Sequence, residues 1–334
     1  KTKHNEVAPA QHELAPVFDT TNVAVDHNQL TMEIMKKVAD KHDLVCLLHE
    51  KPFEGINGSG KHNNWSMITD DGVNLLDPGK TPSENIQFLV FLMAVIKAVD
   101  EYADLLRISV ASAGNDHRLG ANEAPPAVVS IFLGDELTEV LKSIENDTYF
   151  TSHGAVQMDI GATVLPHFVK DNTDRNRTSP FAFTGNKFEF RMLGSAASVA
   201  NPNIVLNTAV AEALDQFAKE LDGVAPEDME HAVHELIKRA IKKHKRVIFN
   251  GNGYTDEWIE EAEKRGLYNL KSTPDALPMW IAQKNIDLFT KHSIFTSEEL
   301  HSRYEIWLEN YSKTINIESN TMVEMVQKDL LPSV

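Results

Sequence analysis

Two glutamates near the start of the chain are the first residues whose spacing could do chemistry. Glu6 and Glu13 stand seven residues apart in "NEVAPAQHE". On a single strand, an odd separation would put these side chains on opposite faces. Pro9 interrupts the run, so two short segments can each deliver a carboxylate to one point. Two solvated surface glutamates are the alternative interpretation.

A glycine-rich turn precedes the second candidate. In "GINGSGKHNNWSM", residues 55–67, His62 directly follows the glycines. Glycine lets the backbone approach a ligand closely, and successive N–H groups can bind an anion. A neutral imidazole is also a good ligand for a divalent ion. The pattern matches neither a Walker A loop nor a dinucleotide-binding fingerprint, and a surface hairpin that holds one histidine remains the alternative.

The third candidate pairs opposite charges around a stiff loop. Arg118 and Glu123 flank the glycine of "NDHRLGANEAPP", which Pro125 and Pro126 stiffen. An ordinary surface ion pair at this spacing would contribute little to stability. The sequence leaves both interpretations open.

A local concentration of cations marks the fourth candidate. Arg175 and Arg177 lie close together in "DRNRTSPFAFTGNKFEFR", although the chain as a whole is acidic. We therefore interpret them as a local anion site.

The end of the same motif has the pattern of a pocket wall. Strand alternation in "KFEFR" places Lys187, Glu189 and Arg191 on one face, and Phe188 and Phe190 on the other. A half-buried edge strand with its charges in water would look similar.

The elements that must position these residues differ between two parts of the chain. Up to residue 206, strand-like runs, helices and motif loops alternate, and beyond it helical periodicity dominates. Capping patterns predict helices that begin near Thr81, Thr255 and Thr296. We expect helices over 28–42, 81–106 and the start of 135–170, and a buried strand followed by a proline-marked loop over 43–53. We also expect a strand over 107–114 and an extended segment over 124–134.

Composition limits the function classes. The net charge is −17 and the pI is about 5.2, which argues against a nucleic-acid or anionic-membrane partner. Cys46 is the only cysteine, so one chain can form neither a disulfide framework nor a cysteine-based zinc site. The sequence contains no run of about 18 consecutive apolar residues, so it predicts no membrane-spanning helix. We expect a soluble cytoplasmic enzyme, present here as a fragment.

Together, the four motifs in this order resemble glutamine synthetase, specifically its long bacterial type III form. The match covers most of residues 1–206, and the helical part after it is similar to the type III C-terminal region. The resemblance implies an α+β fold: a curved, mainly antiparallel sheet (a partial barrel) flanked by helices. It also implies a catalytic domain over 1–206, a helical region over 207–334, and a ringed homo-oligomer, a dodecamer in this family.

The resemblance further implies ATP-dependent ligation of ammonium to glutamate through a γ-glutamyl phosphate, with Mg²⁺ or Mn²⁺. Each motif residue then acquires a role in metal binding, substrate binding or catalysis. The implied metal ligands are Glu6 and Glu13 for one ion, and His62 and Glu189 for the other. The implied glutamate-site residues are Asn57, Gly58, Arg118 and Arg191; the ATP-site residues are Asn64, Ser66, Lys187 and Arg177; the catalytic residues are Glu123, Arg177 and Arg191.

Three departures from the family pattern accompany the resemblance. Asn64 stands where many members carry a second histidine, and Ala182 stands where an arginine is common, for which Lys187 could compensate. The family's Glu-x-Glu strand and its small N-terminal domain have no counterpart, and we expect both to precede Lys1. Two alternative functions remain: a ligase that joins glutamate to a larger amine, of the γ-glutamylpolyamine type, and a non-catalytic oligomer of the same fold.

Overall fold

A four-stranded sheet forms the centre of the computed structural model, which describes residues 2–50, 53, 55–56, 60–120, 124–148, 157–158, 168–169 and 176–334. The strand order is β3, β8, β7, β4; the first two pairs are antiparallel and the last is parallel. This mixed, mainly antiparallel sheet with flanking helices confirms the expected fold class. The strands are β3 (Lys61–Trp65), β4 (Ile131–Phe132), β7 (Phe181–Phe183) and β8 (Phe188–Leu193).

Two smaller ribbons lie outside this sheet. β1 (Thr2–Asn5) pairs with β2 (His12–Ala15) in an antiparallel hairpin. β5 (Gln157–Met158) pairs with β6 (Phe168–Val169) in the same sense.

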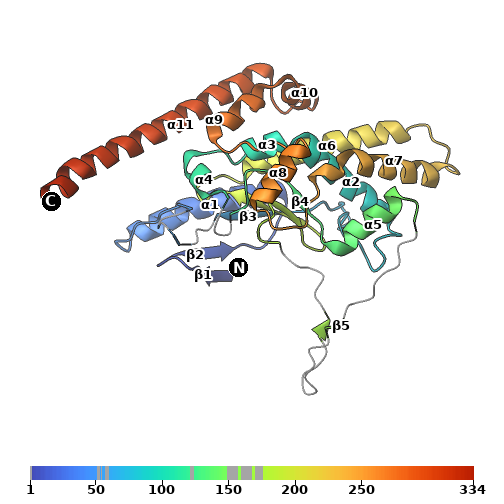
Figure 1. Cartoon of the computed structure of the whole chain (residues 1–334), viewed down its shortest axis with the longest axis horizontal. Helices are drawn as coiled ribbons and strands as arrows, with labels where there is room; N and C mark the ends of the chain where they lie inside the picture. Colours follow the sequence, from blue (N-terminus) through green and yellow to red (C-terminus); the bar gives the residue numbers. More distant parts are fainter. Residues whose placement is uncertain are drawn as a thin grey trace.

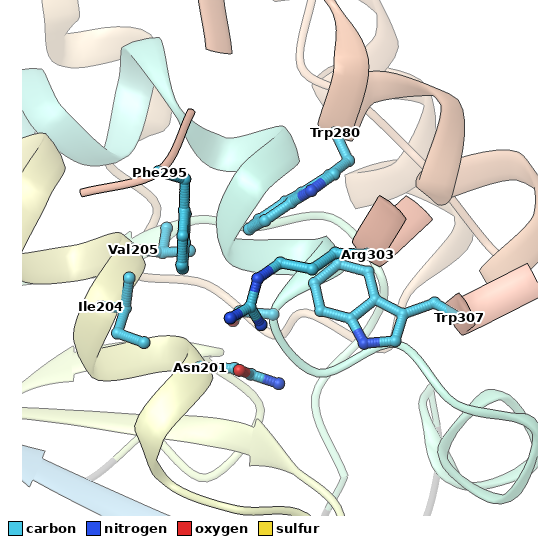
Figure 2. Close-up of a pocket in the computed structure, with 8 residues that line it drawn as sticks. Asn201, Ile204, Val205, Trp280, Phe295, Arg303 and Trp307 are labelled. Atoms are coloured by element: carbon cyan, nitrogen blue, oxygen red, sulfur yellow. The ribbon is translucent and has the colours of Figure 1, made fainter. Parts of the chain in front are cut away.

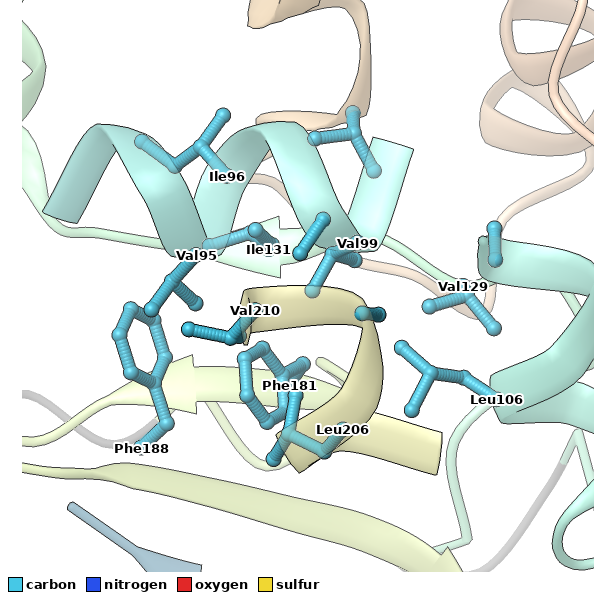
Figure 3. Packing of buried hydrophobic residues seen from close by; sticks show 14 of the residues in the cluster. Val95, Ile96, Val99, Leu106, Val129, Ile131, Phe181, Phe188, Leu206 and Val210 are labelled. Atoms are coloured by element: carbon cyan, nitrogen blue, oxygen red, sulfur yellow. The ribbon is translucent and has the colours of Figure 1, made fainter. Parts of the chain in front are cut away.

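Helices cover one face of the central sheet and bury its aromatic side chains. Figure 3 shows Val95 and Val99 of α2 (Ile86–Glu101) and Val210 of α6 (Ala200–Leu221) packed around Phe181 and Phe188. The two phenylalanine rings are stacked with centroids 4.6 Å apart. All of these side chains belong to one buried apolar cluster. Phe188 and Phe190 therefore pack one face of β8 against the helices. The charged residues of the same strand, Glu189 and Arg191, belong to the opposite face.

The other helices surround this core or extend from it. Each is α-helical unless marked η, which denotes a short 3-10 or π turn. They are α1 (Thr21–Asp40), α3 (Ala103–Ile108), α4 (Ala113–Arg118), α5 (Asp135–Glu145), α7 (Met229–His244), η1 (Lys245–Val247), α8 (Asp256–Lys264), α9 (Thr273–Ala276), η2 (Leu277–Ile281), α10 (Gln283–Lys291), α11 (Ser297–Met325), η3 (Val326–Leu330) and η4 (Leu331–Ser333).

The long helix α11 leaves the body, as Figure 1 shows. Its start has the predicted capping box: Thr296 accepts from the Glu299 N–H, and the Glu299 carboxylate accepts from the Thr296 N–H. Leu300 is its one fully buried residue. Among the helices of the described residues, none combines the length and apolar character needed to cross a membrane.

Several predicted elements are confirmed. α1 contains the predicted apolar face of Leu30, Ile34 and Val38, although that face is exposed. α5 forms at the start of 135–170. Thr255 caps α8, and Gly266 follows its end with φ at +71°.

The prediction of a buried strand at the start of 43–53 is wrong. Residues 44–49 have no regular structure, and Leu44, Val45 and Leu47 are 67–83% exposed. A strand needs a neighbour for its backbone groups, and no strand of the described residues pairs with this run. An apolar run by itself does not supply that neighbour.

Two further predictions need correction. Residues 107–114 form the end of α3, a turn and the start of α4. The buried Arg107 bonds to the Leu270 carbonyl and to Asp116. These bonds pack the segment against other helices, and it does not pair in a sheet. The helix predicted from Thr81 begins instead at Ile86. Asn85 is its cap, because the Asn85 side chain accepts from the Phe88 N–H.

Candidate active site

His62 and Glu189 meet on the face of the sheet opposite the helices. His62 Nδ1 lies 3.1 Å from Glu189 Oε1. Along β3 the exposed His62 and Asn64 alternate with the buried Asn63 and Trp65, which bond to α6 through Asn203 and Asn207. The alternation leaves one face of β3 for packing and one for chemistry.

Glu189 lies between two neighbours in the strand register. Asn64 is its partner on β3, and Ala182 is its partner on β7. Directly paired residues share a face of the sheet. Both positions at which the sequence departs from the family pattern therefore adjoin the same carboxylate.

Arg191 joins this group from the same strand. Its Nε lies 3.7 Å from Glu189 Oε2, and its Nη1 donates to the Asn176 carbonyl at 2.9 Å. Asn176 precedes Arg177, whose side chain is exposed. The structure thus brings Glu189, Arg191 and the turn of Arg177 together.

Glu6 and Glu13 share one face of the β1–β2 hairpin. His4 is paired with Glu13, and the Glu6 N–H bonds to the Gln11 carbonyl at 3.0 Å, which continues the register beyond β1. Glu6 and Glu13 are therefore diagonal neighbours across the hairpin. The turn around Pro9 therefore places both glutamates on one face, whereas a single strand with this spacing would place them on opposite faces.

Arg118 is almost completely buried, with 1% of its surface exposed. Its Nη1 donates to the Leu193 carbonyl at 3.1 Å, and its Nη2 to the Arg191 carbonyl at 3.0 Å. Burial lowers the pKa of Arg118 to about 10, while the nearby Glu50 and Tyr254 act in the opposite direction. In this arrangement Arg118 holds the strand that carries Glu189 and Arg191.

The third glycine of the glycine-rich turn is explained by this packing. A Cβ on Gly60 would lie 2.2 Å from the Leu193 carbonyl oxygen and 2.4 Å from Arg118 Cζ. Only glycine lets the backbone pass so close to the guanidinium.

Two of the four residues predicted for ATP, Ser66 and Lys187, meet at the turn between β7 and β8. Ser66 Oγ donates to the Asn186 carbonyl at 3.0 Å, and Lys187 Nζ lies 3.5 Å from Asn186 Oδ1. Asn64 is exposed on the same edge strand. The structure therefore gathers Ser66 and Lys187 around one turn.

Three predicted site residues lie outside the described part of the chain: Asn57, Gly58 and Glu123. The ends of the loop that holds Glu123 are described, and the Gly120 N–H bonds to the Pro125 carbonyl at 3.0 Å. This bond closes the loop between Arg118 and the proline pair.

Comparison with known proteins identifies the family. The model of the glutamine synthetase catalytic domain matches residues 1–129, and that of the glutamine synthetase C-terminal domain matches residues 232–334. A glutamine synthetase of Butyrivibrio fibrisolvens is 64% identical over 99% of this chain and 47% of its own length. The chain belongs to the glutamine synthetase family.

Two further relatives agree. A type-3 glutamine synthetase of Dictyostelium discoideum is 54% identical over 100% of this chain and 45% of its own length. A glutamine synthetase of Bacteroides fragilis is 45% identical over 99% of this chain and 46% of its own. The chain spans about half the length of the curated relatives it matches. Among solved structures, apo GmaS aligns over 88% of this chain and 51% of its own length at 16% identity, with a TM-score of 0.49.

A divalent metal, as expected for a glutamine synthetase, fits the donors only in part. The imidazole of His62 and the carboxylate of Glu189 are ligands that suit Mg²⁺ or Mn²⁺. Among the described residues, no three His, Cys, Asp or Glu side chains gather into one metal-binding group. His62 and Glu189 thus offer two adjacent donors, and the hairpin glutamates Glu6 and Glu13 lie on a separate element.

The sequence predictions gave no role to two charged residues near this site, Lys61 and Glu50. Lys61 Nζ donates to the Ser195 carbonyl at 2.6 Å and to the Ala197 carbonyl at 2.5 Å, and burial lowers its pKa to about 8 against the opposing charge of Glu50. Arg118 and Lys61 together hold four alternate carbonyls along residues 191–197. Glu50 is 4% exposed, and a Cβ on Gly194 would lie 2.1 Å from its Oε1.

A separate hollow lies between α6, η2 and α11 (Figure 2). Trp280, Phe295 and Trp307 surround it, and Arg303 Cζ lies 4.3 Å from the centroid of the Phe295 ring. Its lining consists of residues other than those predicted for the glutamine synthetase site.

Proposed function

We propose that the protein joins ammonia to the side-chain carboxylate of L-glutamate at the expense of ATP. The observation that carries the proposal is the contact of His62, Glu189 and Arg191 on one face of the sheet, in a chain of the glutamine synthetase family. His62 and the Glu189–Arg191 pair belong to two motifs that are distant in sequence. The proposed reaction needs a metal ligand and a cation close together, and the fold brings these two motifs into contact.

The reaction has two steps. A carboxylate is a poor electrophile, so the γ-phosphoryl group of ATP first passes to the glutamate side chain, which gives γ-glutamyl phosphate and ADP. Ammonia then attacks the activated carbonyl carbon, the C–N bond forms, and inorganic phosphate leaves. A bound Mg²⁺ or Mn²⁺ would offset phosphate charge.

The chain's own residues have separate roles in this proposal. Arg177 and Arg191 offset the charge of the phosphoryl group in transfer. Glu123 takes a proton from ammonium, because only neutral ammonia is a nucleophile. Asn64, Ser66 and Lys187 contact ATP; Asn57, Gly58 and Arg118 contact glutamate; Glu6, Glu13, His62 and Glu189 bind the metal ions.

The proposed contact of Arg118 with glutamate is compatible with the burial of its side chain, because one N–H of the guanidinium is not used within the described residues. Its Nε is buried, and it has no hydrogen-bond partner among the described residues. One N–H of this guanidinium therefore remains for a substrate carboxylate that approaches from that side. Contact with glutamate then needs only a local opening, and the bonds to the Arg191 and Leu193 carbonyls can stay.

The wider assembly belongs to the same proposal. We place the protein in the cytoplasm, as a ringed homo-oligomer, with a catalytic domain over 1–206 and a helical region over 207–334. The net charge of −17 and the single cysteine support this location.

The test is glutamine formation by the full-length protein with glutamate, ammonium, ATP and either Mg²⁺ or Mn²⁺. We expect activity that requires all components, and its loss in Glu123→Ala. Glu227→Ala, which removes an exposed loop carboxylate, is the matched control. Full activity in Glu123→Ala would remove the proposed proton acceptor. If the protein strongly prefers a polyamine or ethanolamine over ammonium, the proposed substrate ammonia is wrong and the larger amine takes its place.

A further inference from the structure

A loop of the C-terminal region, Phe249–Tyr254, is firmly anchored to the central sheet. Ile248 forms a parallel bridge with Ile131 of β4, and the Phe249 N–H bonds to the Ile131 carbonyl at 2.8 Å. The Asn250 side chain accepts from the Leu133 N–H at 3.1 Å and donates to Thr138 Oγ1 at 2.7 Å. The loop therefore begins at a fixed point.

The two ends of the loop are joined by a ring contact between Phe249, at its start, and Trp258 of α8, which follows it. The rings of Phe249 and Trp258 stack with centroids 3.7 Å apart and planes 11° apart. Thr255 caps the intervening start of α8. A Cβ on Gly251 would lie 2.6 Å from Phe249 Cζ, so a larger residue there would displace the ring that stacks on Trp258.

This loop bonds to both residues that flank Arg177. Asn176 Nδ2 donates to the Gly251 carbonyl at 2.7 Å, and the Gly253 N–H donates to Thr178 Oγ1 at 2.7 Å. A Cβ on Gly253 would lie 2.8 Å from the Thr178 carbonyl oxygen. The exposed Arg177 thus stands between two residues that the loop holds.

The same loop runs close to a second motif, the one that contains Glu123. The Gly253 position lies 3.4 Å from Pro126 Cδ, measured to a Cβ built there. Pro126 ends the motif whose loop holds Glu123. Asn176 in turn accepts from Arg191 Nη1 at 2.9 Å. One loop therefore connects to the segments that carry Glu123, Arg177 and Arg191.

We infer that the loop Phe249–Tyr254 is a positioning element of the active site, through which the C-terminal region sets the orientation of Arg177 and Arg191. The inference rests on the proposed function for the roles of these arginines. Gly253 and Thr178 are positioning residues: they touch no substrate and act through the turn that holds Arg177. Pre-organised cations stabilise a transition state because they need no rearrangement during the reaction.

The experiment compares paired variants of the full-length protein. Thr178→Val removes the hydroxyl that accepts from Gly253, and Thr178→Ser keeps it. Gly253→Ala places a methyl group against the Thr178 carbonyl. Gly223→Ala is the control, because Gly223 has φ of +79° and nothing within 4 Å of a built Cβ, so it incurs backbone strain away from the site.

We expect kcat to fall about 10- to 100-fold in Thr178→Val and Gly253→Ala, since small misplacement of catalytic groups has effects of that size. The KM values for glutamate and ATP should stay within about threefold, because the substrate contacts remain. Thr178→Ser should recover most of the rate, and Gly223→Ala should lower only the melting temperature.

Amide hydrogen exchange supplies a readout that is independent of activity. Peptides that cover 176–184 should exchange faster in Thr178→Val and Gly253→Ala, and at the wild-type rate in Gly223→Ala. Unchanged kcat and exchange in both loop variants would overturn the inference. So would a loss in which Thr178→Ser is as impaired as Thr178→Val, because the hydroxyl bond would then be irrelevant.

The two proposals fail in different ways. A wild-type protein that forms no glutamine would refute the proposed function, and the exchange measurement would still decide whether the loop holds the turn. An active wild-type protein with insensitive loop variants would refute the positioning role alone.

Discussion

The imidazole Nδ1 of His62 lies 3.1 Å from the Glu189 Oε1 oxygen, across two strands whose register is offset between Lys61 and Asn63. Asn64 is the register partner of Glu189, and His62 lies two residues before Asn64 on the same face of β3. The contact joins two motifs into one site, and it sets the first expectation about metal binding.

His62→Ala should weaken Mn²⁺ binding to the full-length protein. Loss of an outer-shell partner alone costs about 10- to 100-fold in metal affinity, so loss of a direct ligand should cost at least as much. Titration calorimetry measures the dissociation constant. His234→Ala, at an exposed histidine of α7, is the control. Equal affinity in both variants would exclude His62 as a ligand.

Glu50→Gln should destabilise the protein, because Lys61 and Arg118 would lose their shared counter-charge. A broken, fully buried ion pair typically costs about 3–5 kcal/mol. We expect about 2 kcal/mol here, since Lys61 is only partly buried. Denaturant unfolding measures the change, with the exposed Glu227→Gln as control. Stability equal to that of the control would mean that Glu50 does not offset the two cations.

Phe188→Ala should remove support from behind the site. Phe188 is fully buried and contacts the rings of Phe181 and Phe183. Truncation of a buried phenylalanine costs about 3–5 kcal/mol. The comparison is Phe18→Ala, because Phe18 is 92% exposed. The denaturation midpoint should fall in the first variant and hardly change in the second; similar midpoints would contradict this packing.

Lys291→Met should destabilise the junction of α6 and α10 in a pH-dependent way. Hydrogen bonds from Lys219 and Lys291 lower the pKa of Asp215 to about 2, and Asp215 and Glu212 raise the pKa of Lys291. A lowered carboxyl pKa stabilises the fold above the ordinary value of 3.8, and this contribution is lost as the pH falls through about 2. A raised lysine pKa contributes fully below 10.5 and is lost at higher pH.

The melting temperature of Lys291→Met should therefore lie furthest below that of the wild type between about pH 4 and 10. The difference should shrink toward pH 2. Lys313→Met, which loses an exposed pair on α11, is the matched control. A difference that is independent of pH would indicate lost packing and no electrostatic contribution.

Local patterns predicted those elements whose interactions lie within a few residues. Thr296 and Glu299 satisfy each other's backbone groups, so the start of α11 was readable from the sequence. The alternation of "KFEFR" likewise predicts that Phe188 and Phe190 lie on the opposite face from Glu189 and Arg191, as the ring stacking and the ion pairs show. The apolar run at 43–53 failed as a predicted strand because pairing depends on a distant partner.

The sequence by itself determined the family and the residue types of the site, since motif order and chemistry are local properties of the chain. Only the tertiary structure decided that Arg118 bonds to carbonyls of β8, that Glu50 lies against Gly194, and that the loop at Gly253 reaches Thr178. These contacts join segments that are far apart along the chain. Their positions follow from burial and backbone hydrogen bonding, which no short pattern encodes.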